Sequence, residues 1–323
     1  MLDLKNKFKE FSKVIEEKSK FLIIGHEQPD GDAIGALLAL REFIQDKNKI
    51  VSMVVSSEVP DIFSFLPNVE KINNDFLFGD YEVIILVDNG DLRRTGFTSR
   101  ILKAKGSNIP IVNIDHHPQN DVWKKASINI AEPKASSTCE IIYDLFSYLK
   151  YPLSPSVATS ILLGIYGDTG GFQHPNTSKK VMLIASELLK KGAKLKKISS
   201  SVSQSRSVKM LKLWGLAINN IFEYQNSGLM VSIISKNDIK KVGASEEEIS
   251  GLVNLLNTAS ESKASLLIYE TLDDKIRGSL RTDRDDVDVS KFAKILGGGG
   301  HKKASGFSLS GNLKKIDNIW SIV

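Results

Sequence analysis

Four short runs rich in valine and isoleucine constrain the first half of this 323-residue chain more than any other feature. They read FLIIG, IVSMVV, VIILVD and IVNID, and they span residues 21–25, 50–55, 83–88 and 111–115. Each has the length of a strand that is buried on both faces. A helical pattern, AIGALLALREFI, separates the first two runs. This alternation predicts an α/β domain with a mostly parallel sheet that helices flank.

Three apolar helical patterns follow these runs. They read STCEIIYDLFSYL, PSVATSILLGIYG and SKKVMLIASELLKKG, and the last is expected to stop at Gly192. We therefore predict a first domain over residues 1–190. The segment 191–225 is rich in lysine and serine, and we interpret it as a basic helical linker.

The remaining residues, 226–323, predict a smaller α+β domain. Strands are expected at LMVSII, ASLLIYE and KIRGSL, which span 229–234, 264–270 and 275–280. Helices are expected near 245–259 and 289–296. A last helix is expected after the glycine-rich segment GGGGHKKASGFSLS.

Composition excludes several classes of protein. The single cysteine, Cys139, rules out an intramolecular disulfide framework and a cysteine-based zinc site, and its apolar context predicts a buried thiol. The N-terminal residues have an amphipathic helical pattern and not the pattern of a signal peptide. No apolar run approaches the ~20 residues that a membrane span needs. We therefore expect a soluble, cytoplasmic protein without a membrane partner.

Positive charge is concentrated in one segment. The chain has a formal net charge of +5, and residues 179–212 hold ten Lys or Arg against one acid, Glu187. Residues 1–178 are net acidic. The cationic segment is able to guide a polyanion, and it is equally consistent with the solvated surface of a helical linker. The sequence leaves both interpretations open.

Aspartate and histidine residues gather where four of the apolar segments end. In an open parallel sheet the ligand crevice lies outside the carboxyl ends of the strands, so these residues should converge there. Oxygen and nitrogen ligands without thiolates suit Mn²⁺, Mg²⁺ or Co²⁺, and crowded carboxylates need cations to neutralise them. A lone aspartate is often only a helix cap, but the recurrence favours a metal site. In chain order the residues are His26, Asp30 and Asp32, then Asp88, then Asp115, His116 and His117, and finally Asp168.

These clusters carry a resemblance to a known family. GHEQPDGDAIGA, VDNGD, DHHP and YGDTGGF resemble, in order, the four motifs of the DHH phosphoesterase superfamily. GGGGHKKASG resembles the signature of the DHH-associated C-terminal domain. The chain length resembles the bacterial nano-RNase and pAp-phosphatase (NrnA-like) group. VDNG differs mildly from the commoner VDTG and VDCG forms, but the aspartate is present.

The resemblance implies roles for these residues and a cleft between the two domains. One divalent cation would be held by His26, Asp30 and Asp88. A second would be held by Asp32, Asp88, His116 and Asp168, with Asp88 as the bridge. Mn²⁺ is the expected ion, with Mg²⁺ and Co²⁺ as alternatives. A hydroxide that bridges the two cations would attack the phosphate. His117 would face the phosphate or protonate the leaving group, and Asp115 would orient the histidines.

The C-terminal domain supplies the predicted substrate contacts. Glycines allow backbone amides to approach an anion closely, although four glycines alone are also typical of a flexible loop. Arg281 is expected to clamp a phosphate with its bidentate guanidinium. Phe172 and His174 are candidates for stacking on a base, with core packing as the alternative for Phe172. The predicted substrate-binding residues are Ser279, Arg281, Gly298, Gly299, Gly300, His301 and Ser305.

The implied activity is hydrolysis of short RNA or DNA oligonucleotides to mononucleotides, together with dephosphorylation of pAp to AMP. Two alternatives use the same chemistry. One is a phosphodiesterase for the linear dinucleotide pApA of the cyclic-di-AMP pathway, and the other is a RecJ-like single-strand exonuclease. Pyrophosphate or polyphosphate hydrolysis goes with a different C-terminal domain. A non-enzymatic nucleotide-binding module would be expected to lack a metal ligand. A homodimer, the preferred length and the polarity of attack stay open.

Overall fold

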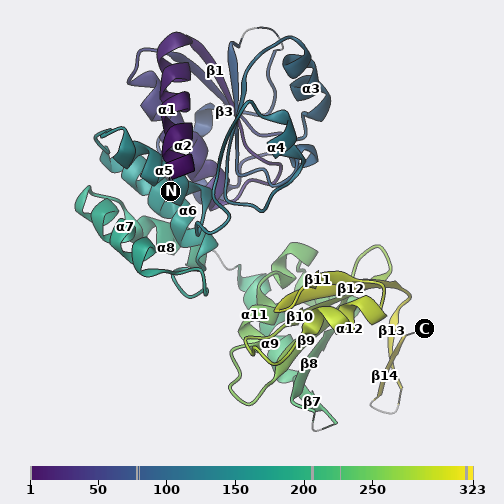
Figure 1. Cartoon of the computed structure of the whole chain (residues 1–323). Helices are drawn as coiled ribbons and strands as arrows, with labels where there is room; N and C mark the ends of the chain where they lie inside the picture. Colours follow the sequence, from purple (N-terminus) through teal and green to yellow (C-terminus); the bar gives the residue numbers. More distant parts are fainter. Residues whose placement is uncertain are drawn as a thin grey trace. The chain divides into compact units, whose positions relative to one another are not determined.

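The chain forms two compact units in the computed structural model, Met1–Ser205 and Arg206–Val323 (Figure 1). The structure describes residues 2–77, 79, 81–204, 207–225, 227–316 and 319–322.

The first unit is built on a six-stranded parallel sheet with the strand order β3-β2-β1-β4-β5-β6. The order reverses between β1 and β4, and such a switch point opens a crevice at the carboxyl ends of the two strands. The candidate site of the first unit lies at this crevice. The strands are β1 (Lys20–Ile24), β2 (Ile50–Val54), β3 (Ile72–Asn73), β4 (Val83–Val87), β5 (Ile111–Asp115) and β6 (Ile128–Ala131).

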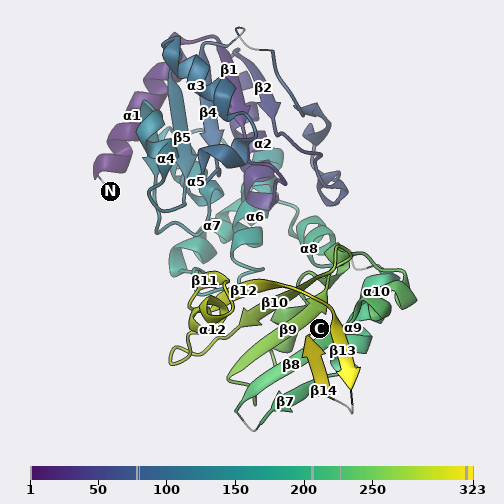
Figure 2. The same cartoon turned by 90° about the vertical axis from the view of Figure 1, so that its right-hand side faces the viewer.

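Helices cover both faces of this sheet (Figures 1 and 2). In β1, Phe21 and Ile23 belong to the larger core, whereas Leu22 and Ile24 belong to the smaller core on the other face. This two-sided burial explains why the strands read as continuous apolar runs. The larger core includes α1 (Leu2–Glu17), α2 (Gly31–Gln45), α5 (Thr138–Tyr148), α6 (Pro155–Asp168), α7 (Lys179–Lys190) and α8 (Leu195–Gln204); the smaller core includes η3 (Leu92–Thr95), α3 (Thr98–Gly106) and α4 (Asp121–Lys125).

Glycines allow α2 and α6 to pack closely behind the crevice. A Cβ atom on Gly35 of α2 would lie 2.3 Å from the backbone oxygen of Ser160. A Cβ atom on Gly164 of α6 would lie 2.4 Å from Oδ1 of Asp32. Both distances are far below van der Waals contact, so neither position accepts a side chain without a shift of the helices.

The second unit is a six-stranded mixed sheet with the order β11-β12-β10-β9-β8-β7. A core on one face includes α9, η4 and α11 with α10, and a core on the other face includes α12 and the β13–β14 hairpin. The strands are β7 (Phe222–Tyr224), β8 (Leu229–Ile234), β9 (Ala264–Glu270), β10 (Lys275–Arg281), β11 (Gly299–His301), β12 (Ala304–Ser310), β13 (Leu313–Ile316) and β14 (Ile319–Ile322). The helices are α9 (Val208–Asn219), α10 (Lys236–Val242), η4 (Glu246–Ile249), α11 (Leu252–Leu256) and α12 (Val289–Ile295).

Most predicted elements are present, and several strands and the C-terminus differ. The fold class is confirmed, with the parallel sheet and its flanking helices in the first unit and a smaller mixed sheet in the second. In the first unit the sequence reading missed β3 and β6, because β3 is two residues long and β6 alternates buried and half-buried residues. In the second unit it missed β7, β11 and β12. The predicted C-terminal helix is wrong. Residues 313–316 and 319–322 pair as strands, and Leu313 and Trp320 pack against the core of the sheet.

The segment 191–225, predicted as a linker, contains the boundary between the two units at residues 205 and 206. Ile198 of α8 is buried in the larger core of the first unit. Leu213 and Trp214 of α9 are buried in the second unit. Each half of the segment therefore adds an apolar helix face to one unit. None of the helices in the described part of the chain has the length and apolar composition that a membrane crossing requires.

The α2–α6 contact yields a stability prediction. Gly35→Ala should lower the free energy of unfolding of the first unit by about 2 kcal/mol, because the new methyl group overlaps the backbone of α6. Gly106→Ala is the matched control, since a Cβ atom at Gly106 meets nothing within 4 Å. Urea denaturation followed by circular dichroism measures both variants. Equal midpoints for the two would contradict the close packing.

Candidate metal centre

The predicted ligands of the first unit do converge at the switch point. Loops and helix ends that follow β1, β4 and β5 bring them to one edge of the sheet, and α6 ends beside them. Three groups have ligand atoms within 4.8 Å of one another. These groups are His26, Asp30 and Asp88; Asp32, His116 and Asp168; and Asp88, His116 and His117.

His26 presents a lone pair to two carboxylates. Its Nδ1 lies 2.7 Å from the carbonyl oxygen of Glu27, and a carbonyl only accepts, so Nδ1 carries the hydrogen. The Nη2 atom of Arg94, also a donor, lies 3.2 Å from the same Nδ1 and does not compete for this hydrogen. Nε2 is the ring nitrogen that remains for a cation, and it lies 3.7 Å from Oδ1 of Asp30 and 3.6 Å from Oδ2 of Asp88. These gaps exceed a hydrogen bond, and a cation fits the arrangement of one lone pair and two carboxylates.

The start of α2 positions Asp30 and Asp32. Asp30 is the N-cap, and its Oδ1 accepts from the backbone amides of Asp32 at 2.9 Å and Ala33 at 3.1 Å. Asp32 is fully buried, and its two oxygens accept from the amides of Thr138 at 2.6 Å and Cys139 at 2.9 Å. Those amides open α5, and the positive end of a helix favours a carboxylate. A helix cap was the alternative role for an aspartate such as Asp32. In the structure it is Asp30, two residues earlier, that caps α2.

Asp88 lies directly after β4 in a left-handed conformation, with φ of 58°. Such a conformation is costly for a residue other than glycine and persists where the surroundings determine it. The backbone amide of Asp88 donates to Ile114, and its Oδ1 accepts from Oγ1 of Thr138 at 3.1 Å. The next residue, Asn89, donates from Nδ2 to the carbonyls of Ile24 and Val87, which ties the ends of β1 and β4 together.

Asp115 orients His117. Oδ1 of Asp115 lies 2.7 Å from Nδ1 of His117 and accepts from the His117 backbone amide at 3.0 Å, while Oδ2 accepts from the amide of Gly90. Nδ1 of His117 therefore carries the hydrogen that it donates to Asp115. Although this Nδ1 lies 3.7 Å from Oδ1 of Asp88, it has no lone pair for a cation. His117 consequently offers only Nε2 to a ligand, and its half-buried ring is accessible for that purpose.

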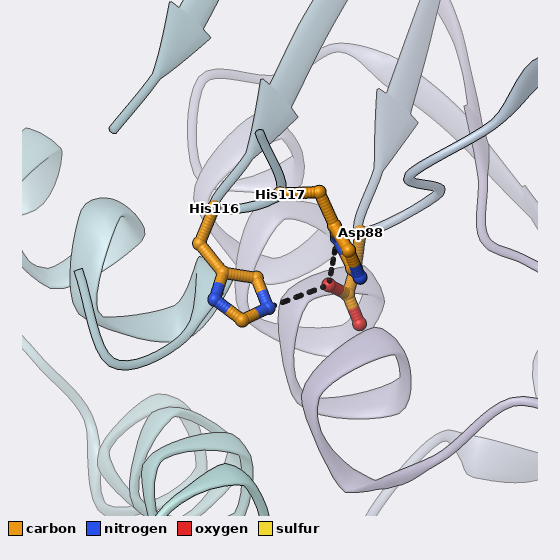
Figure 3. A group of neighbouring side chains, drawn as sticks. All are labelled: Asp88, His116 and His117. Atoms are coloured by element: carbon orange, nitrogen blue, oxygen red, sulfur yellow. Dashed lines mark ion pairs between the residues drawn. The ribbon is translucent and has the colours of Figure 1, made fainter. Parts of the chain in front are cut away.

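His116 follows Asp115 at the end of β5 and lies near two carboxylates. Figure 3 shows that the rings of His116 and His117 both approach Asp88. Its Nε2 lies 3.6 Å from Oδ1 of Asp88 and 3.2 Å from Oδ2 of Asp168. The two histidines share Asp88 as a neighbour but differ in their second partner. Asp168 lies beside Nε2 of His116, whereas Asp115 accepts from Nδ1 of His117. That nitrogen is therefore not free for a cation in the group that His117 forms with Asp88 and His116.

Asp168 is the last residue of α6, where the negative end of the helix disfavours a carboxylate. The carbonyl oxygen of Asp168 faces Nδ1 of His174 at 3.1 Å. The turn that follows has three consecutive residues with positive φ, Gly170, Gly171 and Phe172. Phe172 packs edge-on against Tyr166 and borders the larger core, so the structure favours packing over stacking for this residue.

The charges of the cluster are incompatible with one another unless protons or cations neutralise them. Burial and then the charge of Asp32 raise the pKa of Asp88 to about 8. Burial and the charges of Asp32 and Asp88 raise that of Asp168 to about 10. Burial lowers the pKa of His26, but the neighbouring carboxylates of Asp30 and Asp88 outweigh it and raise the pKa to about 10 in the absence of cations. Divalent cations stabilise the charged forms in place of protons, so the donor set fits metal ions.

Two residues that support the ligands were missed by sequence reasoning. Thr138 contacts both Asp32 and Asp88, and Asn89 joins the ends of two strands. Ser137 and Glu140 mark the start of α5 by the usual capping pattern, which signals free amides. No sequence pattern, however, tells which distant carboxylate those amides bind.

The second unit brings most of its predicted residues to one face of its sheet. Arg281 of β10 pairs with Ala304, which pairs with His301 of β11, and residues opposite each other across strands share a face. Ser279 and Gly299 flank Gly306 two residues further along, on the same face. Arg281 is held by Asn254, whose Oδ1 accepts from Nε at 3.0 Å.

Gly299, Gly300 and His301 of the glycine-rich segment form the strand β11, so the flexible-loop alternative does not hold for these residues. A Cβ atom on Gly298 would lie 2.2 Å from the carbonyl oxygen of Gly306, and one on Gly300 would lie 2.6 Å from that of Ala304. These two glycines are needed for strand packing. Ser305 lies on the opposite face, where its hydroxyl donates to the carbonyl oxygen of Val289 at 2.8 Å. Ser305 therefore joins β12 to α12 and is not among the residues that the face brings together.

Comparisons with known proteins give matches for both units. Residues 20–165 match the model of the DHH family, N-terminal domain, and residues 226–323 match the DHHA1 domain. The chain is 29% identical to the bifunctional oligoribonuclease and PAP phosphatase NrnA of Mycoplasma genitalium, over 95% of this chain and 93% of that protein. It is 29% identical to the protein of the same name from Bacillus subtilis, over 88% and 87%. An exopolyphosphatase-related protein from Bacteroides fragilis has a similar structure, with a TM-score of 0.85, 28% identity and coverage of 95% and 92%.

The cluster predicts how stability depends on pH in metal-free protein. The folded-state pKa values of Asp88, Asp168 and His26 all lie above their unfolded values, so the folded protein binds more protons between about pH 5 and 9. The free energy of unfolding should therefore fall as the pH rises through this window, by on the order of 2 kcal/mol.

Thermal melts of chelator-treated protein from pH 5 to pH 9 measure this fall, and added Mn²⁺ should remove most of it. Asp88→Asn should flatten the profile. A stability that rises with pH in the metal-free protein would be inconsistent with the crowded carboxylates.

Proposed function

The chain belongs to the DHH family, and we propose that it is a phosphoesterase that hydrolyses short oligoribonucleotides to mononucleotides and dephosphorylates pAp to AMP. The observation that carries the proposal is the set of aspartate and histidine ligands at the β1–β4 switch point, with ligand atoms close enough to share cations. The two NrnA proteins, which it matches over most of its length, bear the names of both activities.

We further propose that the cluster holds two divalent cations, with Mn²⁺ as the preferred ion. His26, Asp30 and Asp88 are the proposed ligands of one, and Asp32, Asp88, His116 and Asp168 of the other. Bound cations at such a site lower the pKa of water and stabilise charge on a phosphoryl group. The residues contribute fixed geometry, because α5 amides hold Asp32 and the strained loop after β4 holds Asp88.

His117 is the proposed proton donor to the leaving group. The hydrogen bond to Asp115 raises the pKa of His117, because the carboxylate stabilises the imidazolium form. Nδ1 stays protonated toward Asp115, so the proton available for transfer is at Nε2. Asp115 is a positioning residue in this scheme, since it fixes the ring and its tautomer without touching the phosphate.

We propose that the sheet face with Arg281, Ser279 and His301 binds the part of the substrate away from the scissile phosphate. The guanidinium of Arg281 has one nitrogen committed to Asn254 and one to its own strand, at the Leu280 carbonyl. This anchoring orients the planar group for an anion. Gly299 lies two residues from His301 on β11, and Gly306 separates it from Ser279 across the sheet. A Cβ atom at Gly299 would meet nothing within 4 Å, so the backbone is accessible on this face.

Loss of Asp88 should abolish activity. Asp88→Asn keeps the volume but removes the carboxylate that both ligand groups share, so turnover should fall by at least about a thousandfold and Mn²⁺ affinity should fall with it. Asp75→Asn, an exposed aspartate paired with Arg100, is the control and should retain wild-type turnover. Release of AMP from pAp and calorimetric titration of Mn²⁺ give the two readouts. A tenth of wild-type activity in Asp88→Asn would exclude a shared ligand.

Arg281→Ala and His301→Ala should act on substrate binding. Both should raise KM by about tenfold or more, and kcat falls too where the lost contact also positions the scissile phosphate. Mn²⁺ affinity should be unchanged, because neither residue is a proposed ligand. Arg284→Ala removes an exposed arginine that pairs with Asp286, and it serves as the control. Reduced Mn²⁺ binding by Arg281→Ala would show that the residue has been given the wrong role.

A panel of substrates distinguishes the proposed function from the alternative phosphoesterase activities. With few phosphate contacts, kcat/KM for a trinucleotide should exceed that for a 20-mer by at least roughly tenfold and depend weakly on salt. In the basic segment, Lys180 and Lys190 are already paired with acids, which reduces the positive charge free for a strand. The panel contains pAp, pApA, a trinucleotide, a 20-mer and pyrophosphate. Equal turnover of both lengths with a steep salt dependence would favour the RecJ-like alternative.

A further inference from the structure

We propose that an apolar pocket in the first unit, beside the carboxylate cluster, binds the base of the nucleotide whose phosphate is at the metal centre. The inference rests on the proposed function and deepens it, because it assigns a subsite to the part of the substrate that the metal ligands do not recognise.

The pocket adjoins the metal centre directly. It has a volume of about 350 Å³, and Asp30 and Asp168 form part of its lining. The rest of the lining is apolar, and Pro60, Ile62 and Val202 contribute to it. A volume of this size lies within the range of small-ligand sites, which are mostly apolar with few polar groups. A phosphate held at the carboxylates by cations would thus have an apolar space next to it.

The apolar walls are partly exposed although they flank a charged site. Ile62 is 36% exposed and Val202 is 37% exposed. Of the described residues that line the pocket, Asp30 and Asp168 alone have polar side chains. The faces of a nucleobase are the only large apolar surfaces of an oligonucleotide, since its phosphates and riboses are polar. When a base packs against Ile62 and Val202, the apolar surfaces of the base and of the two side chains are both removed from water.

The walls are held in place before any ligand binds. Ile62 lies in η1 (Asp61–Phe63), where Phe63 is buried in the larger core and its amide donates to the Pro60 carbonyl at 3.0 Å. Val202 lies on α8, which packs against η1. The loop from β2 to η1 is joined to the loop that precedes α2, since the amide of Gln28 donates to Oγ of Ser57 at 2.7 Å. A preformed pocket costs little conformational entropy on binding.

Apolar walls predict tolerance of base identity. The side chains of Pro60, Ile62 and Val202 carry no hydrogen-bond donor or acceptor that could distinguish the edge of one base from another. Every base, however, has a face that packs on apolar groups. The subsite should therefore require a base and discriminate weakly among bases. This behaviour suits an enzyme that degrades short fragments of any sequence.

The test compares AMP, UMP and ribose 5-phosphate in calorimetric titrations of the full chain with Mn²⁺. Wild-type protein should bind AMP at least about tenfold more tightly than ribose 5-phosphate, and UMP should lie within about tenfold of AMP. Val202→Trp fills the pocket, and Ile62→Ser removes an apolar wall. Both should bring AMP affinity down toward that of ribose 5-phosphate while Mn²⁺ affinity stays unchanged. Ile50→Ser is the control, because Ile50 is 60% exposed at the opposite end of β2 and should leave AMP binding unchanged.

Several outcomes would overturn the subsite. Equal affinities of wild-type protein for AMP and ribose 5-phosphate, an absence of AMP binding, or unchanged AMP affinity in both pocket variants would each do so. Hydrolysis of the trinucleotide is measured on the same samples. Base-dependent AMP binding without any hydrolysis would support the subsite and refute the proposed function. Hydrolysis of the trinucleotide together with equal binding of AMP and ribose 5-phosphate would support the proposed function and refute the subsite.

Discussion

Electrostatic repulsion among buried carboxylates is the constraint on which the first unit depends. Asp32 and Asp88 are almost wholly removed from water, and Asp30 and Asp168 lie beside them. Charged groups so close together in a region of low dielectric cannot all ionise unless cations or protons accompany them. The raised pKa values of Asp88 and Asp168 express this conflict. A protein that keeps such a cluster needs a scaffold strong enough to hold it together.

The scaffold uses helix ends of opposite sign. The amino end of α5 donates two amides to Asp32, which stabilises its charge. The carboxyl end of α6 does the opposite for Asp168, which leaves that residue dependent on a cation. Close packing of α2 on α6, made possible by Gly35 and Gly164, brings Asp32 of α2 near Asp168 at the end of α6. Stability elsewhere in the fold therefore compensates for the strain and repulsion at the site.

The second unit shows a different use of glycine. Gly298 and Gly300 allow β11 and β12 to approach closely, while Gly299 leaves open space on the face that carries Arg281 and His301. The glycines Gly299 and Gly306 lie beside the row that Arg281, Ala304 and His301 form, and accessible backbone next to these side chains suits a phosphate or ribose better than an apolar group. Ser305 illustrates the limit of motif reading, because it belongs to the same segment but faces the other side of the sheet.

The sequence by itself determined the fold class, the main strands and the identity of the ligand candidates. Runs such as VIILV can be read because burial on both faces leaves no polar residue in the strand, and Asp88 stands out at the end of such a run. The edge strand β6 and the C-terminal hairpin could not be read. Their patterns are mixed, and their conformation follows from contacts with a neighbouring strand or sheet.

Only the tertiary structure decided which role each candidate ligand has. His116 and His117 are adjacent and chemically identical in the sequence, yet Asp115 takes Nδ1 of one while Asp168 and Asp88 face Nε2 of the other. The pocket walls at Ile62 and Val202 were likewise invisible, because residues 140 positions apart meet only when α8 folds onto η1. Ring orientation and long-range contact depend on the packing of distant segments, and local sequence patterns carry no information about either.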